Sequence, residues 1–500
     1  MNKITATKFY DYTQCPHRIW RDEYGPQEEK DPEPNPFVQL LWEKGILHEE
    51  EVINNVGDFT DLSRGTYKER FEKTIREMRK GTDLIYHGVI VYSNLLGIPD
   101  LLQSNGDGTY TPVDIKSGRG YEGSEEEDSE KYKKHYAVQL CHYVEMLKQL
   151  GFANSDKAKI IDIRNNEVTY DLQREMSIKN KNTWWQYYYK TRNEIELLLE
   201  NKTQNKPAIT GICKLCPWYK SCKKWAKENK DLTTIFYLGR NRRDTLNKDL
   251  GIERVEDIIH INLTEILAKK ERDKNFLVGI GGKTLSKIVQ RALILNSNAE
   301  PVIYGYFNFP KKSYELYFDI EDDPTQELVY LHGVYERSPK GERFVYFAAK
   351  DTTPKAEKRT WTEFWKYIRS LPQNDYAVYY YSQHEKTIYK KMRELYPDVV
   401  SEDELESFFD KERAIDLYTQ VVLPHTDWPL GSYSVKEIAQ YLGFKWRDET
   451  PSGALSIQWY NEYIIDKDPK KLERILLYNE DDCKAMLVIK DYLVKRQNNA

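Results

Sequence analysis

Two segments in the first half of the chain combine acidic and basic side chains at spacings that suit phosphate chemistry. Asp100 ends the run LLGIPD, and Asp114 and Lys116 follow in VDIKSG. Because side chains alternate across a β-strand, Asp114 and Lys116 would share one face. Two carboxylates and a nearby histidine can hold divalent cations that polarise a phosphate and generate hydroxide, while a lysine neutralises developing charge. An ordinary ion pair on an exposed strand is the alternative interpretation.

A second acidic set lies in the last two hundred residues. Asp319 and Glu321 share a face of the predicted strand ELYFDIED, and Tyr478 and Asp482 are four residues apart on a predicted helix. Between them, the segment YYSQHEKTIYKKM offers the carboxylate of Glu385. Metal binding and water activation could therefore meet in this part of the chain.

Four cysteines have a spacing typical of a metal site. Cys213, Cys216 and Cys222 lie close together in CKLCPWYKSC, and Cys15 precedes a proline far upstream. Four thiolates can complete a tetrahedral zinc site or bind a four-iron cluster. The spacing alone favours zinc, and scattered core thiols are the remaining alternative.

The surrounding pattern predicts three domains of an α/β protein. Residues 1–230 mix helices with a compact run of strands, and a loop is expected over residues 118–134. Residues 231–300 are helical, and Gly279 to Gly281 interrupt two amphipathic segments, as in a helix-hairpin-helix whose amides bind phosphate with help from Lys283 and Lys287. A plain helical linker is the alternative. Residues 301–500 begin with three strands and then alternate helix and strand, which suggests an RNase H-like sheet.

Composition limits the classes of function. The chain has 500 residues and a net charge of -5. This charge argues against a protein that binds polyanions over its whole surface, although a local basic groove could bind nucleic acid. No apolar stretch is long enough for a membrane span, and the start MNKITATKFYDYTQCPHRIW has no secretory apolar run. We therefore expect a cytoplasmic protein without a membrane partner.

The first 230 residues resemble a known nuclease family. CPHRIW and CKLCPWYKSC, with GILHE, IPD, VDIKSG and QLCHY between them, resemble the iron-sulfur subgroup of RecB-like PD-(D/E)XK nucleases, which includes CRISPR-associated exonucleases and the AddB nuclease domain. The resemblance implies a restriction-endonuclease-like domain with a 4Fe-4S cluster. It implies the following roles: Cys15, Cys213, Cys216 and Cys222 as cluster ligands, His48, Asp100 and Asp114 as Mg²⁺ or Mn²⁺ ligands, Lys116 as the catalytic lysine, and Gln139 with Tyr143 as substrate-orienting residues.

Residues 301–500 resemble the DEDD exonucleases, with a D-I-E strand and a tyrosine four residues before an aspartate. The resemblance implies that Asp319, Glu321 and Asp482 bind metal and that Tyr478 takes part in catalysis. Glu385 stands where that family has an aspartate, so this position departs from the pattern. Asp416 is the alternative carboxylate, for which we expect a supporting role.

Together these features predict a metal-dependent DNA nuclease that cuts ends or single strands in DNA repair, recombination or defence. A helicase or a repair or defence protein is the expected kind of partner, and the oligomeric state is not indicated. Two alternatives stay open: a nucleic-acid-binding scaffold with one inactive site, and an RNA-processing exonuclease.

Overall fold

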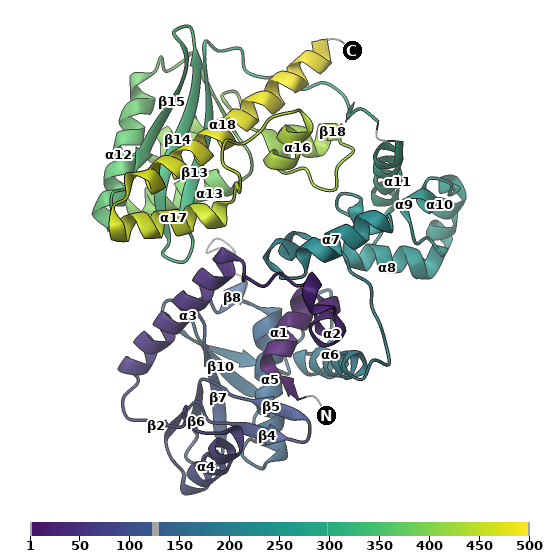
Figure 1. Cartoon of the computed structure of the whole chain (residues 1–500), viewed down its shortest axis with the longest axis vertical. Helices are drawn as coiled ribbons and strands as arrows, with labels where there is room; N and C mark the ends of the chain where they lie inside the picture. The colour runs from purple at the N-terminus through teal and green to yellow at the C-terminus, as the bar shows by residue number, and fades with distance from the viewer. Residues whose placement is uncertain (1–2, 123–129, 298, 499–500) are drawn as a thin grey trace. The chain divides into compact units, whose positions relative to one another are not determined.

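The chain folds into two compact units (Figure 1). The computed structural model describes residues 3–122, 130–297 and 299–498. The first unit comprises Met1–Pro207 and Ile212–Ser221, and the second comprises Ala208–Gly211 and Cys222–Ala500. Residues 231–300, which we expected to form a separate connector, lie in the second unit in this division.

Two sheets organise the first unit. The larger has six strands in the order β11-β10-β7-β6-β3-β2, and the smaller has the order β1-β5-β4. Part of the loop expected over residues 118–134 falls on residues 123–129, outside the described residues, and its flanks form the antiparallel pair β8 and β9. The strands are β1 Ile4–Thr5, β2 Thr60–Asp61, β3 Leu84–Tyr86, β4 Ile90–Tyr92, β5 Leu95–Gly97, β6 Leu101–Ser104, β7 Tyr110–Ile115, β8 Tyr121–Glu122, β9 Lys131–Tyr132, β10 Lys157–Ile161 and β11 Glu167–Asp171.

The central helix of the first unit is α5, which is buried along most of its length and contacts β7, β10, α1 and α6. Helix α3 packs Val52 and Ile53 against Val113 and Ile115 of β7. Side-chain caps start two further helices, at Thr66 and Thr183. The helices are α1 Ala6–Gln14, α2 Pro16–Tyr24, η1 Gln27–Glu29, α3 Pro36–Asn55, α4 Tyr67–Lys80, α5 Lys134–Gln149 and α6 Trp184–Leu199; η2 Gly211–Leu215 and α7 Tyr219–Glu228 follow at the boundary of the units.

A five-stranded sheet in the order β15-β14-β13-β16-β17 forms the core of the second unit. The first three strands are antiparallel neighbours, and β16 and β17 continue the sheet in parallel. The strands are β12 Val302–Ile303, β13 Tyr314–Asp323, β14 Leu328–Ser338, β15 Gly341–Ala348, β16 Tyr376–Tyr380, β17 Ala414–Asp416 and β18 Thr426–Asp427.

Helices of the second unit cover this sheet, and the long helix α18 crosses β13 and β14 (Figure 1). A separate apolar cluster joins α8, α9 and α11. The helices are η3 Leu232–Thr234, α8 Gly239–Leu250, α9 Val255–Ile258, α10 Leu263–Arg272, α11 Gly282–Ser297, α12 Pro354–Ser370, α13 His384–Leu395, α14 Glu402–Phe408, η4 Leu417–Val422, α15 Leu423–His425, α16 Val435–Tyr441, α17 Gly453–Asp466 and α18 Pro469–Asn498.

The alternation of side chains on β13 assigns its two faces. Phe318 lies in the apolar core with Phe364 of α12, their ring centroids 6.0 Å apart. Asp319 and Glu321 point to the opposite face, where both accept hydrogen bonds from Asn479 of α18. The period of two therefore separates an apolar face from an acidic face on one strand.

Candidate metal centres

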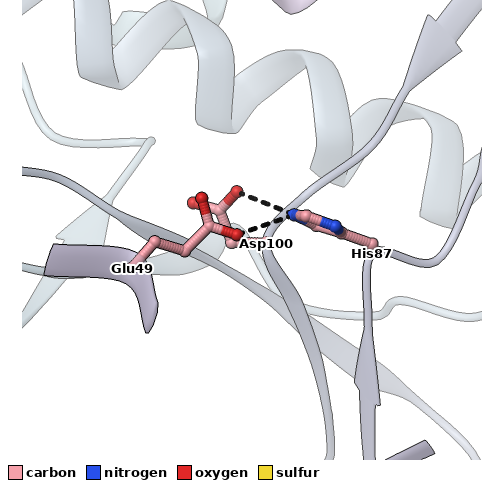
Figure 2. Close-up of side chains that lie close together, drawn as sticks. All are labelled: Glu49, His87 and Asp100. Atoms are coloured by element: carbon pink, nitrogen blue, oxygen red, sulfur yellow. Dashed lines mark ion pairs between the residues drawn. The ribbon is translucent and has the colours of Figure 1, made fainter. Parts of the chain in front are cut away.

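One group of metal-ligating side chains lies in the first unit. The ligand atoms of Glu49, His87 and Asp100 all lie within 4.8 Å of one another. His87 Nε2 is 2.8 Å from Glu49 Oε1 and 3.8 Å from Asp100 Oδ1 (Figure 2). Glu49 comes from α3, His87 follows β3, and Asp100 precedes β6. Three separate elements therefore present two oxygen donors and one nitrogen donor to a common point.

The predicted pair Asp114 and Lys116 lies beside this group. Asp114 is almost fully buried on β7, and Lys116 Nζ lies 2.7 Å from its Oδ2, just beyond the end of the strand. The backbone N–H of Ile115 donates to Asp100 Oδ2 at 2.6 Å, which holds Asp100 against β7. Burial, Asp114 and Glu49 raise the pKa of Asp100 to about 7, although Lys116 opposes the shift. Because the carboxylates repel one another, either a bound proton or a bound cation would stabilise this group.

Three other predicted residues of this site have different surroundings. His48 is buried, and its Nε2 lies 3.0 Å from the carbonyl oxygen of Asp162. Gln139 Nε2 donates to the carbonyl of Ala6 at 3.3 Å. Tyr143 is buried one turn further along α5, and burial together with the nearby carboxylates raises its pKa well above the usual range. Tyr143 therefore borders the acidic group, and the metal-ligand role of His48 stays a prediction.

The cysteines are divided between the units. Cys15, Cys213 and Cys216 belong to the first unit and Cys222 to the second. Burial raises the pKa of the Cys216 thiol, and the thiols of Cys15 and Cys213 raise it further. Among the residues that the structure describes, the groups whose metal-ligating atoms lie within 4.8 Å of one another do not include these thiols. Beside these cysteines, Trp218 is buried and donates its Nε1–H to Asp22 Oδ1 at 2.8 Å.

A second group of metal-ligating side chains lies in the second unit. The carboxylate oxygens of Asp319, Glu321 and Asp482 lie within 4.8 Å of one another. Strand β13 supplies two of the carboxylates and helix α18 the third. Burial, followed by Asp482, raises the pKa of Glu321 to about 8, and burial with both neighbours raises that of Asp319 well above its usual range. An all-oxygen donor set of this kind fits Mg²⁺ or Mn²⁺.

Hydrogen bonds from neighbouring side chains fix these carboxylates. Asn479 Nδ2 donates to Asp319 Oδ2 at 2.8 Å and to Glu321 Oε1 at 3.3 Å. Trp446 Nε1 donates to Asp482 Oδ1 at 2.6 Å. Polar donors that orient metal ligands in this way preserve the geometry of a metal site.

Tyr478 and a lysine complete the polar surroundings. Tyr478 lies one turn before Asp482 on α18 and is buried. Lys436 of α16 places Nζ 2.7 Å from the Tyr478 hydroxyl and 4.0 Å from Asp482 Oδ2. A positive charge therefore stands beside the acidic group, where it can balance charge on a bound phosphate.

The remaining predicted carboxylates of this unit differ in their roles. Glu385 is buried at the start of α13, and its negative charge helps to raise the pKa of Asp319, after burial and the two closer carboxylates. Asp416 uses Oδ1 to cap the helix η4 and accepts from Gln383 and Thr419 through Oδ2. These bonds occupy both carboxylate oxygens of Asp416, and its expected supporting role stays a prediction.

The glycine segment of the predicted helix-hairpin-helix joins α10 to α11, and Gly279 has a left-handed backbone with a φ of 81°. Lys287, however, lies 2.8 Å from Oδ2 of the buried Asp427, which also pairs with Arg291. Lys283 is exposed. Lys287 thus stabilises the packing of α11 within the second unit, and its expected phosphate contact stays a prediction.

Sequence reasoning missed several residues that border the two groups. In the first unit it selected His48 and passed over its neighbour Glu49 and the distant His87. In the second unit it missed Lys436 and Asn479. Asn479 has a usable signal, since it directly follows Tyr478 on the predicted helix. Nothing in the spacing of His87 or Lys436 pointed to these sites.

Membrane and family comparisons bear on the class of protein. Among the described residues, no helix combines the length and apolarity that a bilayer crossing requires. No curated protein sequence matches the chain. Residues 316–494 match the family described as the RNase_H superfamily. This range contains all three carboxylates of the second metal centre. It also contains the five strands β13 to β17, except for the first two residues of β13. The second unit therefore contains an RNase H-like domain, as the sequence predicted.

Proposed function

We propose that this protein is a divalent-metal-dependent nuclease whose second unit hydrolyses phosphodiester bonds. The observation that carries the proposal is the convergence of Asp319, Glu321 and Asp482 within an RNase H-like domain. A Mg²⁺ or Mn²⁺ ion held by these carboxylates would polarise the phosphate and lower the pKa of a water molecule. The residues present fit that ion because their donor atoms are all oxygen and lie within 4.8 Å of one another.

The remaining side chains have complementary tasks in this proposal. Lys436 donates to the phenolic oxygen of Tyr478, so the phenol O–H can in turn orient the attacking water. The Lys436 ammonium also neutralises charge on the phosphate during hydrolysis. Asn479 keeps Asp319 and Glu321 in position without adding charge. Glu385 adds a further acidic group near Asp319.

For the first unit we propose a second nuclease site of the RecB-like PD-(D/E)XK type. Support comes from the close approach of Asp100, Asp114 and Lys116, the combination that the sequence motif predicts. DNA ends or single strands are the proposed substrate, with repair, recombination or defence as the setting and a helicase or a protein of the same pathway as the partner.

We also propose that Cys15, Cys213, Cys216 and Cys222 bind a 4Fe-4S cluster. Support comes from their order in the chain, in which Cys15 precedes the nuclease motifs and the other three cysteines follow them. A cluster shared by these cysteines would join segments far apart in sequence and restrict the unfolded chain. Metal analysis and visible absorbance of anaerobically purified protein test this proposal, because a colourless, zinc-loaded sample excludes the cluster.

The nuclease proposal is tested with end-labelled DNA and matched RNA in Mg²⁺ or Mn²⁺. Wild type is compared with Asp114→Ala, Asp482→Ala, the double variant and the exposed control Glu406→Gln. We expect the double variant to be inactive and the control to equal wild type. Cleavage by the double variant at the wild-type rate would refute the site assignments. A wild-type protein that binds DNA without cutting would instead support a scaffold, and a preference for RNA would support the RNA-processing alternative.

A further inference from the structure

The metal-ligating group of the first unit contains a histidine that no motif selects. His87 lies in the short turn between β3 and β4, nearly forty residues after Glu49 in the chain. Its Nε2 nevertheless approaches both carboxylates, at 2.8 Å from Glu49 Oε1 and 3.8 Å from Asp100 Oδ1 (Figure 2). All three side chains are half-buried, with 18–26% of their surface exposed. A small cation could therefore reach them.

The backbone of His87 is held in an uncommon conformation. Its φ is 52°, in the left-handed region that residues other than glycine seldom adopt. Two hydrogen bonds hold it there: its N–H donates to the carbonyl of Asp100 at 3.0 Å, and its carbonyl accepts from Arg70 Nη2 at 2.8 Å. Because such a conformation typically costs about 1–3 kcal/mol, it persists only where surrounding contacts maintain it. Here those contacts join His87 directly to Asp100.

Neighbouring side chains orient both the imidazole and the carboxylate. The ring of Tyr86 stacks on that of His87 with centroids 3.9 Å apart. The hydroxyl of Tyr86 donates to Glu49 Oε1 at 2.7 Å. A single tyrosine therefore positions two members of the group, which is the kind of support that metal ligands receive from surrounding residues.

We propose that His87, with Glu49 and Asp100, is a ligand of the cation in the first unit, and that its nitrogen makes this site favour Mn²⁺ over Mg²⁺. Imidazole suits transition metals, whereas Mg²⁺ takes oxygen ligands almost exclusively. The acidic group of the second unit has oxygen donors alone and lacks this preference. This inference rests on the proposed metal site of the first unit and replaces His48 by His87 as its histidine ligand.

The test uses the full chain with Asp319→Asn and Asp482→Asn, which removes two of the three carboxylates of the second metal centre. Mn²⁺ binding is followed by electron paramagnetic resonance, and pulsed spectra report coupling of bound Mn²⁺ to a ¹⁴N nucleus. In this background His87→Asn is compared with the control His48→Gln. Asparagine tolerates the left-handed backbone, so the fold of the turn is kept. Unfolding curves of each variant verify that it is folded.

We expect ¹⁴N coupling in the background protein and in His48→Gln, and its loss in His87→Asn. Mn²⁺ affinity should fall roughly 10-fold or more in His87→Asn, while Mg²⁺ affinity, measured by competition, changes less. Coupling that survives in folded His87→Asn would overturn the assignment. Loss of coupling in His48→Gln instead would also overturn it, yet leave the proposed metal site intact. Absence of Mn²⁺ binding in the background protein would refute both proposals.

Discussion

Replacing Gly333 by alanine should disable the acidic group of the second unit without changing any of its ligands. Gly333 lies on β14 directly opposite Asp319 in the sheet. A Cβ atom added there would stand 1.7 Å from Asn479 Oδ1 and 2.9 Å from its Cγ. No rotation of the alanine relieves this overlap, because the position of Cβ is set by the backbone. The Asn479 amide must therefore leave its place.

The displaced amide no longer donates to Asp319 and Glu321. Each hydrogen bond to a charged group contributes about 1.5–3 kcal/mol, and overpacking of a filled interior adds about 1–3 kcal/mol of destabilisation. Since displacement of a positioned group by about 1 Å can cost roughly 100-fold in rate, we expect a loss of that order in metal-dependent cleavage by Gly333→Ala. The rate is measured in the Asp114→Ala background, so that only the second unit contributes.

A matched control is Gly453→Ala at the start of α17. Its added Cβ would make an ordinary contact of 3.9 Å with the Tyr478 hydroxyl, close to the same site. We expect this variant to retain wild-type activity. If Gly333→Ala, shown by unfolding curves to be folded, cleaves as fast as the control, Asn479 has no positioning role and the reasoning is refuted.

Three further predictions concern charge and metal. Lys436→Met should lower kcat about 100-fold with little change in KM, because the ammonium acts on developing charge; an effect on KM alone would contradict this. In metal-free protein, folded Glu321 keeps its proton up to a pKa of about 8, so the free energy of unfolding should fall as pH rises from about 4.5 to 8, and Glu321→Gln should flatten that slope in thermal melts. Cys216→Ser should remove iron and lower the unfolding temperature of the first unit alone, as seen by calorimetry; an unchanged first transition would count against the cluster.

The features that sequence predicted best are those set by local periodicity. Alternation along ELYFDIED placed Asp319 and Glu321 on one face, and helical spacing brought Tyr478 and Asp482 to one side. Both expectations follow from the geometry of a single element. The structure then brings these elements together, since helix α18 packs on strand β13.

The features that sequence could not predict depend on contacts between distant elements. His87 approaches Glu49 through two separate contacts. Strand β3, which precedes His87, pairs with β6, which follows Asp100, and helix α3, which carries Glu49, packs against β7. Lys436 reaches Tyr478 from a different helix. No spacing within one segment encodes such approaches: the motif pointed to His48, whereas the structure groups its neighbour Glu49 with His87 and Asp100.

Both acidic groups bury like charges at a cost that the metal-free protein must bear. The raised pKa values of Asp100 and Glu321 express that cost, since each carboxyl holds its proton to a pH where an exposed one would be ionised. The first group offsets part of it with Lys116, whose Nζ lies 2.7 Å from Asp114 Oδ2, whereas the Lys436 Nζ of the second group lies 4.0 Å from Asp482 Oδ2. A cation would supply the missing charge in each case. The second group, whose lysine is more distant, should therefore depend more strongly on a bound divalent cation for its stability.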